Sequence, residues 1–323
     1  MRLVVTGSLA YDYLMTFPGR FREHFLSERL HRLTVSFLVD DLRRLRGGVA
    51  GNIAWTLALL GSRPLLLATA GEDFGEYKAT LDANGVDTSG VTVIPGEFTA
   101  SCFINTDLDA NQIVAFYAGA LSHGHRLELE PLQLGPSDLV VISPTDPESM
   151  ARAVEACRAA RVPYLFDPGK QTPRLEPAQI VEGMESAAVV VGNDYEFALM
   201  SQKTGRSEAV LQSLAPVTVV TRGEQGSTVL QRGKAPLDVP VAPIRSLVDP
   251  TGAGDAYLGG LVYGMWKGLP WALAGRVGSV AAAYAIEVRG CQEHHYTPSQ
   301  FLDRYREAFG EAPPVTAALA PGR

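Results

Sequence analysis

The sequence predicts an α/β protein in which a mostly parallel sheet carries helices on both faces. Short apolar runs that read as strands alternate with helical stretches, the runs at 139–143, 164–167, 188–191 and 217–221 and the helices at 147–160 and 194–204. This alternation is typical of parallel strands joined by crossover helices. Because such sheets hold ligands in loops at the carboxyl ends of their strands, we expect functional side chains there.

The N-terminal part adds strands of a different kind. Residues 2–6 form a β-branched run that predicts a buried strand, and residues 53–60 and 65–69 predict a helix and the next strand. Two stretches, about 10–46 and 97–119, instead alternate apolar and polar residues and carry many aromatics, which indicates exposed antiparallel strands. The first stretch alternates most clearly over 33–40. We expect the two stretches to form one small sheet that serves as a lid.

The C-terminal part predicts two helices and a tail. Residues 256–266 and 272–288 are apolar and helix-like, whereas residues 311–323 are rich in Ala and Pro and are expected to fray. No internal repeat or interdomain linker interrupts the pattern. We therefore expect one domain over 1–310 and a flexible tail over 311–323.

Composition narrows the classes of function. With a net charge of −7 and no run of Lys and Arg, the chain is a poor candidate for binding nucleic acid or an anionic membrane. Its apolar runs are too short to span a bilayer or to serve as a signal peptide. The odd and scattered cysteines, Cys102, Cys157 and Cys291, predict reduced thiols, so we expect a cytoplasmic protein.

The most informative stretch is Asp249-Pro-Thr-Gly-Ala-Gly-Asp-Ala-Tyr257, which opens a predicted helix. Small residues at Gly252, Ala253 and Gly254 allow their N–H groups to point one way, and the start of a helix favours anions. Asp255 stands beside these amides, and we expect the helix end to keep its carboxylate ionised. An anion cradle next to a fixed carboxylate suits phosphoryl transfer to a hydroxyl. A plain Gly-rich helix cap remains the alternative from this stretch alone.

The same stretch resembles the C-terminal signature of the ribokinase-like (PfkB) family of small-molecule kinases, D-T-x-G-A-G-D, with Pro250 in place of a commoner Thr. The resemblance implies a three-layer ribokinase-like fold and use of ATP and Mg²⁺. It also implies that Asp255 is the base, that Gly252–Gly254 form the anion hole and that Thr251 lies at the nucleotide. Some members use K⁺ beside the anion hole, which makes Asp249 a candidate ligand for a monovalent cation.

Several N-terminal residues match the substrate site of that family. Gly47-Gly48-Val-Ala-Gly-Asn52 resembles the motif whose glycines admit a sugar hydroxyl and whose Asn bonds to it, although an Asn that caps a helix is the ordinary alternative. Ser8 and Asp12 match positions that hold hydroxyls, and a carboxylate accepts two such bonds well. Asp12 as a turn cap is the other interpretation.

The nucleotide side is predicted from two further motifs. Asn193-Asp-Tyr-Glu196 resembles the N-x-x-E motif, in which Glu196 organises Mg²⁺ through water, and it also fits a capping box at a helix start. Thr221-Arg-Gly223-Glu-Gln-Gly226 resembles the T-x-G-x-x-G nucleotide contact, whereas a hairpin turn would explain the two glycines equally well.

Three other patterns contain residue types that are common in functional sites. Lys170 and Gln171 follow a strand end, so both are expected to face the substrate. Asp73-Phe-Gly spells the metal-binding triplet of protein kinases, but without the companion motifs of that class it predicts only a structural turn. The pairs His123/His125 and His294/His295 have no acid or Cys organised with them, so we expect exposed histidines rather than a metal site.

Within the family, Phe-Pro-Gly-Arg-Phe21, Leu-Val-Asp-Asp41 and Gly-Cys-Gln-Glu293 resemble bacterial adenosine kinases. This implies transfer of the γ-phosphate of ATP to the 5′-hydroxyl of adenosine and a homodimer through the lid. Phe37, Phe103 and Phe116 are candidates to stack on the base. The stacking aromatic expected at position 102 stands at 103, and a shift of one residue in a strand reverses its face. Lys170 replaces an uncharged amide. A sugar kinase for ribose, fructose or a deoxy-sugar acid, or a silent nucleotide-binding protein, are the alternatives.

Overall fold

The computed structural model describes residues 2–25 and 34–320. In these ranges nine strands form the main sheet, in the order β13-β12-β11-β10-β9-β8-β1-β4-β5. The strands pair in parallel, except that β12 and β13 run antiparallel to their neighbours. Their bounds are β1 Leu3–Thr6, β4 Leu65–Ala70, β5 Val91–Val93, β8 Leu139–Ile142, β9 Tyr164–Phe166, β10 Val189–Asn193, β11 Val217–Thr221, β12 Ser227–Gln231 and β13 Leu237–Val239. The predicted, mostly parallel sheet is confirmed.

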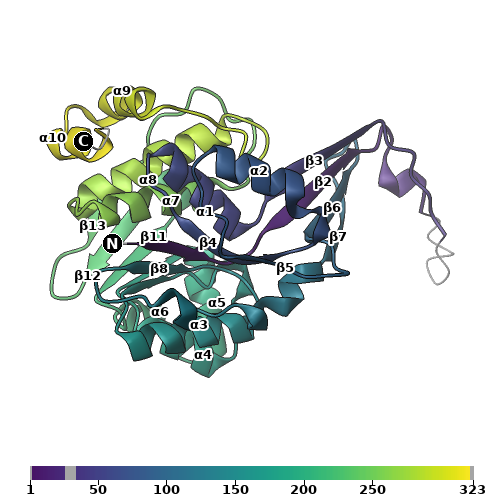
Figure 1. Ribbon diagram of the computed structural model, residues 1–323. Coiled ribbons are helices and arrows are strands. Elements are labelled where there is room, and N and C mark those ends of the chain that lie inside the picture. The colour runs from purple at the N-terminus through teal and green to yellow at the C-terminus, as the bar shows by residue number, and fades with distance from the viewer. Residues whose placement is uncertain (1, 26–33, 321–323) are drawn as a thin grey trace.

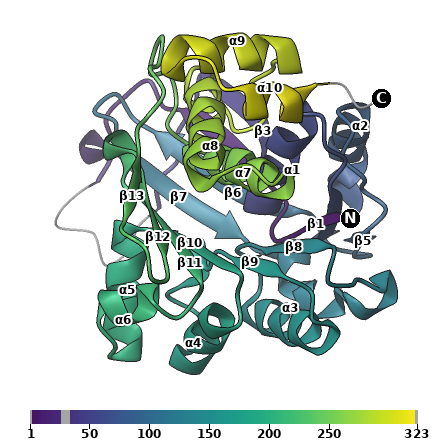
Figure 2. The same ribbon diagram turned by 90° about the vertical axis from the view of Figure 1, so that its left-hand side faces the viewer.

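Helices cover both faces of this sheet (Figures 1 and 2). One layer contains α1 Val49–Leu59, α2 Gly75–Ala83, α7 Ala253–Trp266, α8 Trp271–Ile286 and α9 Pro298–Phe309, and the other contains α3 Pro147–Ala160, α4 Pro177–Glu185, α5 Asp194–Thr204 and α6 Glu208–Gln212. Side chains of β1 alternate between the two layers, since Val5 packs in the first core and Val4 in the second. Among the described helices none is long and apolar enough to cross a membrane.

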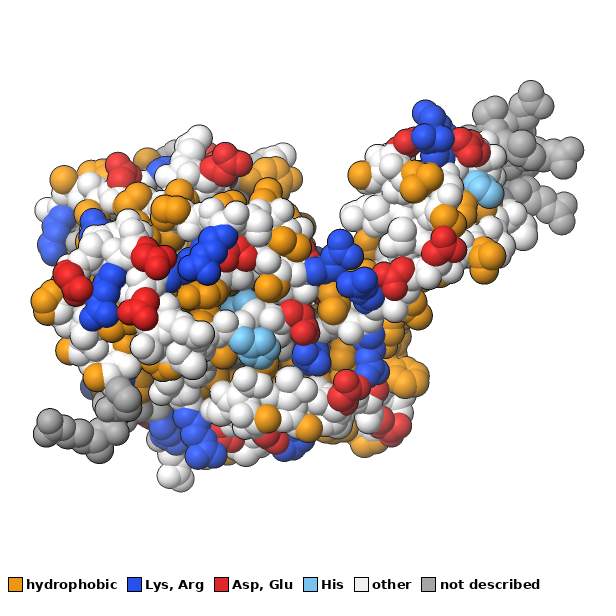
Figure 3. All heavy atoms as spheres, turned by 90° about the horizontal axis from the view of Figure 1, so that it is seen from above, with side chains coloured by type: hydrophobic (Ala, Val, Ile, Leu, Met, Phe, Trp, Pro, Cys, Tyr) orange, Lys and Arg blue, Asp and Glu red, His pale blue; other side chains and the backbone are white. Residues whose placement is uncertain are grey.

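The predicted lid is a separate four-stranded sheet in the order β3-β2-β6-β7. Its strands are β2 Ala10–Thr16, β3 Asp41–Gly47, β6 Ala100–Thr106 and β7 Gln112–Tyr117. The lid projects from the body (Figures 1 and 3), and on the face that Figure 3 shows, basic and acidic side chains are mixed. Unlike the expected antiparallel arrangement, its two central strands β2 and β6 are parallel. They follow β1 and β5, two strands of the main sheet that run in the same direction on either side of β4.

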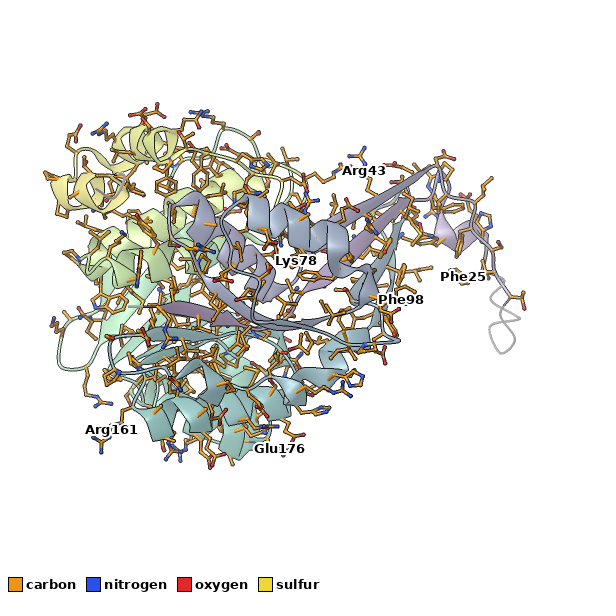
Figure 4. The ribbon with its side chains drawn as sticks, viewed as in Figure 1. Phe25, Arg43, Lys78, Phe98, Arg161 and Glu176 are labelled. Carbon is orange, nitrogen blue, oxygen red and sulfur yellow. The ribbon has the colours of Figure 1, made fainter. Side chains whose placement is uncertain are left out.

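The base of the lid is fastened to the body. The Asp73 carboxylate accepts hydrogen bonds from the Thr99 backbone N–H at 2.8 Å and from the Thr99 hydroxyl at 2.7 Å. Phe98, the residue before Thr99, lies where the lid meets the body (Figure 4). Gly71 allows this approach, since a Cβ there would lie 2.2 Å from the Phe98 carbonyl carbon. The structural turn role predicted for Asp73 fits these bonds.

Two boundary predictions differ from the structure. The alternating stretch 33–40 is not a strand over 34–40, and residue 33 lies outside the described residues; β3 begins at Asp41. The tail also contains a helix, α10 Pro313–Leu319, in which Val315 and Leu319 are buried on one side. This spacing of four residues gives the helix an apolar face, and its Ala318 carbonyl accepts from the Tyr263 hydroxyl at 2.7 Å. Residues 321–323 are outside the described range.

Candidate active site

A cleft of about 760 Å³ lies between the lid and the carboxyl edge of the main sheet. Residues at or just after the carboxyl ends of β1, β9, β10 and β11 reach it, as expected for a parallel sheet. The predicted site residues that line it are Ser8, Asp12, Gly48, Asn52, Phe116, Lys170, Gln171, Asn193, Glu196, Thr221, Asp249, Thr251, Gly252, Gly254 and Asp255. The fold therefore brings the lid, α1 and the start of α7 to one place.

The start of α7 offers unoccupied backbone donors to the cleft. Gly252 precedes the helix with φ +79°, and a Cβ at this residue would lie 2.9 Å from Cys291 Sγ. In the described chain no acceptor is recorded for the N–H groups of Gly252 and Gly254, whereas the Ala253 N–H donates to the Pro250 carbonyl at 3.3 Å. Ala253 also does not line the cleft, so two of the three predicted amides face it.

Asp249 joins the two loops that flank this helix start. Its Oδ1 accepts from the Thr251 N–H at 2.9 Å, and its Oδ2 accepts from the Gly290 N–H at 3.1 Å. These bonds give Asp249 a structural role in holding the anion cradle. A role as a monovalent-cation ligand stays a prediction.

Asp255 lies in the first turn of α7, with Oδ2 accepting from Asn52 Nδ2 at 2.7 Å. Burial raises the pKa of Asp255 to about 6, and this outweighs the opposing effects of Asn52 and Lys170. The helix end was expected to keep this carboxylate ionised, but burial acts in the opposite direction and raises the pKa. A carboxylate with a pKa near 6 is still mainly ionised at pH 7 and is well matched to take a proton.

Four more carboxyl groups, those of Asp12, Asp167, Glu196 and Asp249, and one lysine line the cleft. Burial raises the pKa of Asp12, Asp167 and Glu196, and for Asp167 the neighbouring Glu196 and Asp255 add to the rise. Lys170 lowers the pKa of Asp12 and Glu196. Within the described residues no group of three or more His, Cys, Asp or Glu side chains is arranged as a metal site. The acids instead make the cleft electronegative around a single cation.

Asn193 and Glu196, predicted to contact the nucleotide, form the expected capping box. The Glu196 N–H donates to Asn193 Oδ1 at 2.7 Å, and the Asn193 N–H donates to Glu196 Oε2 at 2.8 Å. Both residues and Thr221 also line the cleft. Gly223 and Gly226 do not; they have positive φ in the tight turn between β11 and β12. For these two glycines the hairpin interpretation holds, because the antiparallel pairing requires a sharp turn.

The lid presents one apolar row to the cleft. Cross-strand pairing sets Asp12 opposite Leu45 and Cys102, and Cys102 opposite Phe116. All four side chains line the cleft. Among the described residues of the lid, Asp12 is the only charged one that lines the cleft.

Two predicted aromatics do not reach this row. Phe103 lies on the opposite face of the lid and stacks on Tyr13 with ring centroids 4.8 Å apart, because neighbouring residues of a strand point to opposite faces. Phe37 packs edge-on against Phe17 and Phe21 in an aromatic cluster far from the body. Phe25, which also packs on Phe37, marks this end of the lid in Figure 4.

Ser8 and the paired glycines shape the start of α1. Ser8 Oγ accepts from the Val49 N–H at 3.0 Å, so Ser8 rather than Asn52 caps the helix. Gly48 has φ +88°, and a Cβ there would lie 2.6 Å from the Ser8 carbonyl oxygen. Gly47 does not line the cleft; its carbonyl instead accepts from the Tyr77 hydroxyl at 2.8 Å.

Sequence reasoning missed some residues and misplaced another. Asp167 and Cys102 line the cleft. Asp167 had a usable signal in the sequence, because it follows the same strand, β9, as Lys170 does. Gln292 is fully buried and donates to Asn52. No local sequence pattern predicts this contact. His294 was expected to be exposed but is 1% exposed. The three cysteines are free thiols, as predicted.

The model of the pfkB family of carbohydrate kinases matches residues 6–298. The nucleoside kinase of Methanothermobacter thermautotrophicus is 28% identical over 97% of this chain and 98% of its own length. The structure of Burkholderia thailandensis nucleoside kinase in complex with inosine is 38% identical, with a TM-score of 0.84 over 96% of this chain and 99% of that one. The complex of the same enzyme with ADP and inosine is 37% identical, with a TM-score of 0.80 over 96% and 97% of the two chains.

Proposed function

Since the chain belongs to the pfkB family of carbohydrate kinases, we propose that it is a nucleoside kinase that transfers the γ-phosphate of ATP to a 5′-hydroxyl, with adenosine as the expected acceptor. One observation carries the proposal: a single cleft joins Asp255 and the free amides of α7 to an apolar lid face that bears one carboxylate. The nucleoside kinases of similar sequence and structure, one of them bound to inosine, support the same class of acceptor.

The lid face favours a nucleoside over a bare sugar. Phe116 is 58% exposed on this face, beside Leu45, Cys102 and Ile104. A purine would cover these apolar groups, and a stacked base contributes about 1–3 kcal/mol. Ribose alone would leave them in water. Asp12, in the middle of the row, is placed to accept from the ribose hydroxyls.

In the proposed reaction the acceptor oxygen attacks the γ-phosphorus and its proton passes to the Asp255 carboxylate. The bond from the γ-phosphorus to the bridging oxygen breaks, and ADP leaves. The Gly252 and Gly254 amides stabilise the negative charge on the phosphoryl group. Asn52 uses Oδ1 for Gln292 and one N–H for Asp255, which leaves a second N–H for a substrate hydroxyl.

The acid-rich cleft suits Mg·ATP. Glu196 spends Oε2 on the Asn193 amide and keeps Oε1 for a magnesium-bound water, and Thr221 lies beside it in the cleft. Bound magnesium would supply neutralisation of the phosphate charge. Few protein carboxylates and several waters are what Mg²⁺ prefers, which fits a cleft without a ready-made ligand cluster. The complex of the Burkholderia enzyme with ADP supports ATP as donor.

A homodimer through the lid remains part of the proposal. β7 is an edge strand whose six residues are all exposed, among them Ile113, Val114 and Phe116. A flat, apolar edge of this kind favours pairing with another strand. Sedimentation measured with and without a charged substitution at Ile113 would test it.

The test of function is ADP release from ATP with a panel of nucleosides and sugars. We expect kcat/KM for adenosine to exceed that for ribose by about 5- to 150-fold, the range that a 1–3 kcal/mol contribution of the base corresponds to. Inosine, guanosine and cytidine measure how strictly the base is selected. Equal or better turnover of ribose or fructose would make the chain a sugar kinase.

A further inference from the structure

A chain of buried hydrogen bonds runs from Asp255 to the base of the lid. Asn52 Nδ2 donates to Asp255 Oδ2 at 2.7 Å, and Gln292 Nε2 donates to Asn52 Oδ1 at 2.8 Å. Gln292 Nε2 also donates to the Tyr77 hydroxyl, which in turn donates to the Gly47 carbonyl at 2.8 Å. Gly47 is the last residue of β3, so the chain connects α7 and α1 to the lid.

The direction of these bonds is set at the Gly47 end. A backbone carbonyl can only accept, so Tyr77 gives it the single hydroxyl proton and can then only accept from Gln292. Gln292 must turn its NH₂ group toward Tyr77, and the second proton of that group points at Asn52 Oδ1. Asn52 is left with its own NH₂ group facing Asp255.

The opposite direction does not suit an ionised Asp255. If the Asn52 amide turned over, its oxygen would face the carboxylate at 2.7 Å, and two acceptors repel unless Asp255 holds a proton. In the observed orientation Gln292 Oε1 is buried with no partner among the described residues. Leaving this acceptor unpaired costs free energy. The Gln292 amide keeps the orientation nevertheless, because both protons of its NH₂ group are used in hydrogen bonds.

Water cannot take over these bonds. Gln292 and Tyr77 are fully buried, and Asn52 is 4% exposed. Gly51 provides the space: a Cβ there would lie 2.3 Å from the Tyr77 hydroxyl and 3.0 Å from Gln292 Nε2. The third glycine of the Gly47-Gly48-Val-Ala-Gly51-Asn52 motif thus serves this chain rather than the cleft directly.

We propose that Gln292 and Tyr77 are positioning residues for phosphoryl transfer: acting through Asn52, they keep an N–H group rather than a carbonyl oxygen against Asp255. The base is thereby held in its ionised form. The inference rests on the proposed function, because it concerns the same carboxylate. Other titratable groups around Asp255 stay unchanged in the variants below, namely Asp12 on β2, Asp167 and Lys170 after β9, Glu196 on α5, and Cys291.

Two substitutions test the chain. Gln292→Met keeps the length of the side chain and removes both N–H groups, and Tyr77→Phe removes one hydroxyl. We expect the acidic limb of kcat/KM for adenosine to move up by about one pH unit in Q292M and by less in Y77F. One unit corresponds to about 1.4 kcal/mol, the low end of a hydrogen bond to a charged group.

Tyr164→Phe is the matched control. The Tyr164 hydroxyl is also buried and donates to a backbone carbonyl, that of Gly183, at 2.8 Å, but it packs in the other core. We expect Y164F to leave the acidic limb in place. Any similar shift in this variant would show that loss of a buried tyrosine bond alone moves the profile, and would overturn the inference.

A second readout does not need turnover. The ¹³C resonance of the Asp255 carboxyl group is followed as the pH changes, with the Asp255→Asn variant used to assign it. The pH at the midpoint of this titration should rise in Q292M and Y77F. If both midpoints and both acidic limbs stay where they are while only kcat falls, the two residues are merely structural. If the wild-type chain phosphorylates no nucleoside, the proposed function fails, and the resonance still decides this inference.

Discussion

Replacing Asp255 by Asn should remove activity and add stability at the same time. An Asn at this position keeps the shape and can still accept from Asn52 Nδ2, which donates to Asp255 Oδ2 at 2.7 Å. The variant lacks the base, and general-base catalysis contributes about 10²- to 10⁴-fold. We therefore expect kcat with adenosine to fall by that factor while nucleoside binding, measured by calorimetry, changes little.

The gain in stability follows from the raised pKa of Asp255. The pKa moves from 3.8 to about 6, so at pH 8 the ionised group costs the folded state up to about 3 kcal/mol. The folded protein binds this proton more tightly than the unfolded chain does, so the cost is present above pH 6 and disappears as the pH falls toward 4. For a chain of 323 residues, 3 kcal/mol corresponds to a rise in Tm of about 4 °C at pH 8, with none at pH 4.

Thermal unfolding of D255N and wild type at pH 8 and pH 4, together with their turnover, checks both parts. A variant that kept near-normal kcat would remove Asp255 from the chemistry. A variant that lost stability at pH 8 would mean that the carboxylate is a net structural contact and that the desolvation argument is wrong.

Two further predictions concern residues around the site. Burial lowers the pKa of His294 from 6.5 to about 4, so the unfolded chain takes up the proton first and stability falls with pH below 6.5, by about 2 kcal/mol at pH 5. Urea unfolding should show that His294→Phe lacks this loss relative to wild type; an equal loss in both would exclude His294 as its source. Gly252→Ala should cost about 1–3 kcal/mol from φ +79° plus a clash with Cys291 Sγ at 2.9 Å, and should reduce kcat at least tenfold. Gly268→Ala, at φ +70° with open space around it, is the control: comparable losses of stability and turnover in both would leave no special role for Gly252.

The sequence predicts the body of the fold better than the lid. Helices α3 and α5 occupy the predicted ranges 147–160 and 194–204, because caps and apolar spacing fix such elements locally. In the lid, the face on which a residue lies depends on register, which is set by pairing between distant strands. Phe103 was therefore misplaced, whereas Phe116 lines the cleft. Phe37 lies in no strand of the lid, so register does not account for its position. The alternation around 33–40 marks an aromatic cluster and not a strand.

In the site, the sequence predicts which strand ends meet but not the protonation state of the carboxyl groups there. The carboxyl ends of parallel strands share one edge, so Asn193 and Thr221 could be assigned to one cleft from their positions alone. The protonation of Asp255 depends instead on its depth of burial and on acids contributed from elsewhere, Glu196 and Asp12, which raise its pKa further. Only one lysine, Lys170, lines the cleft among the described residues beside these carboxyl groups. Because Mg²⁺ is part of the proposed function, we expect the wild-type chain to bind ATP more weakly when Mg²⁺ is withheld.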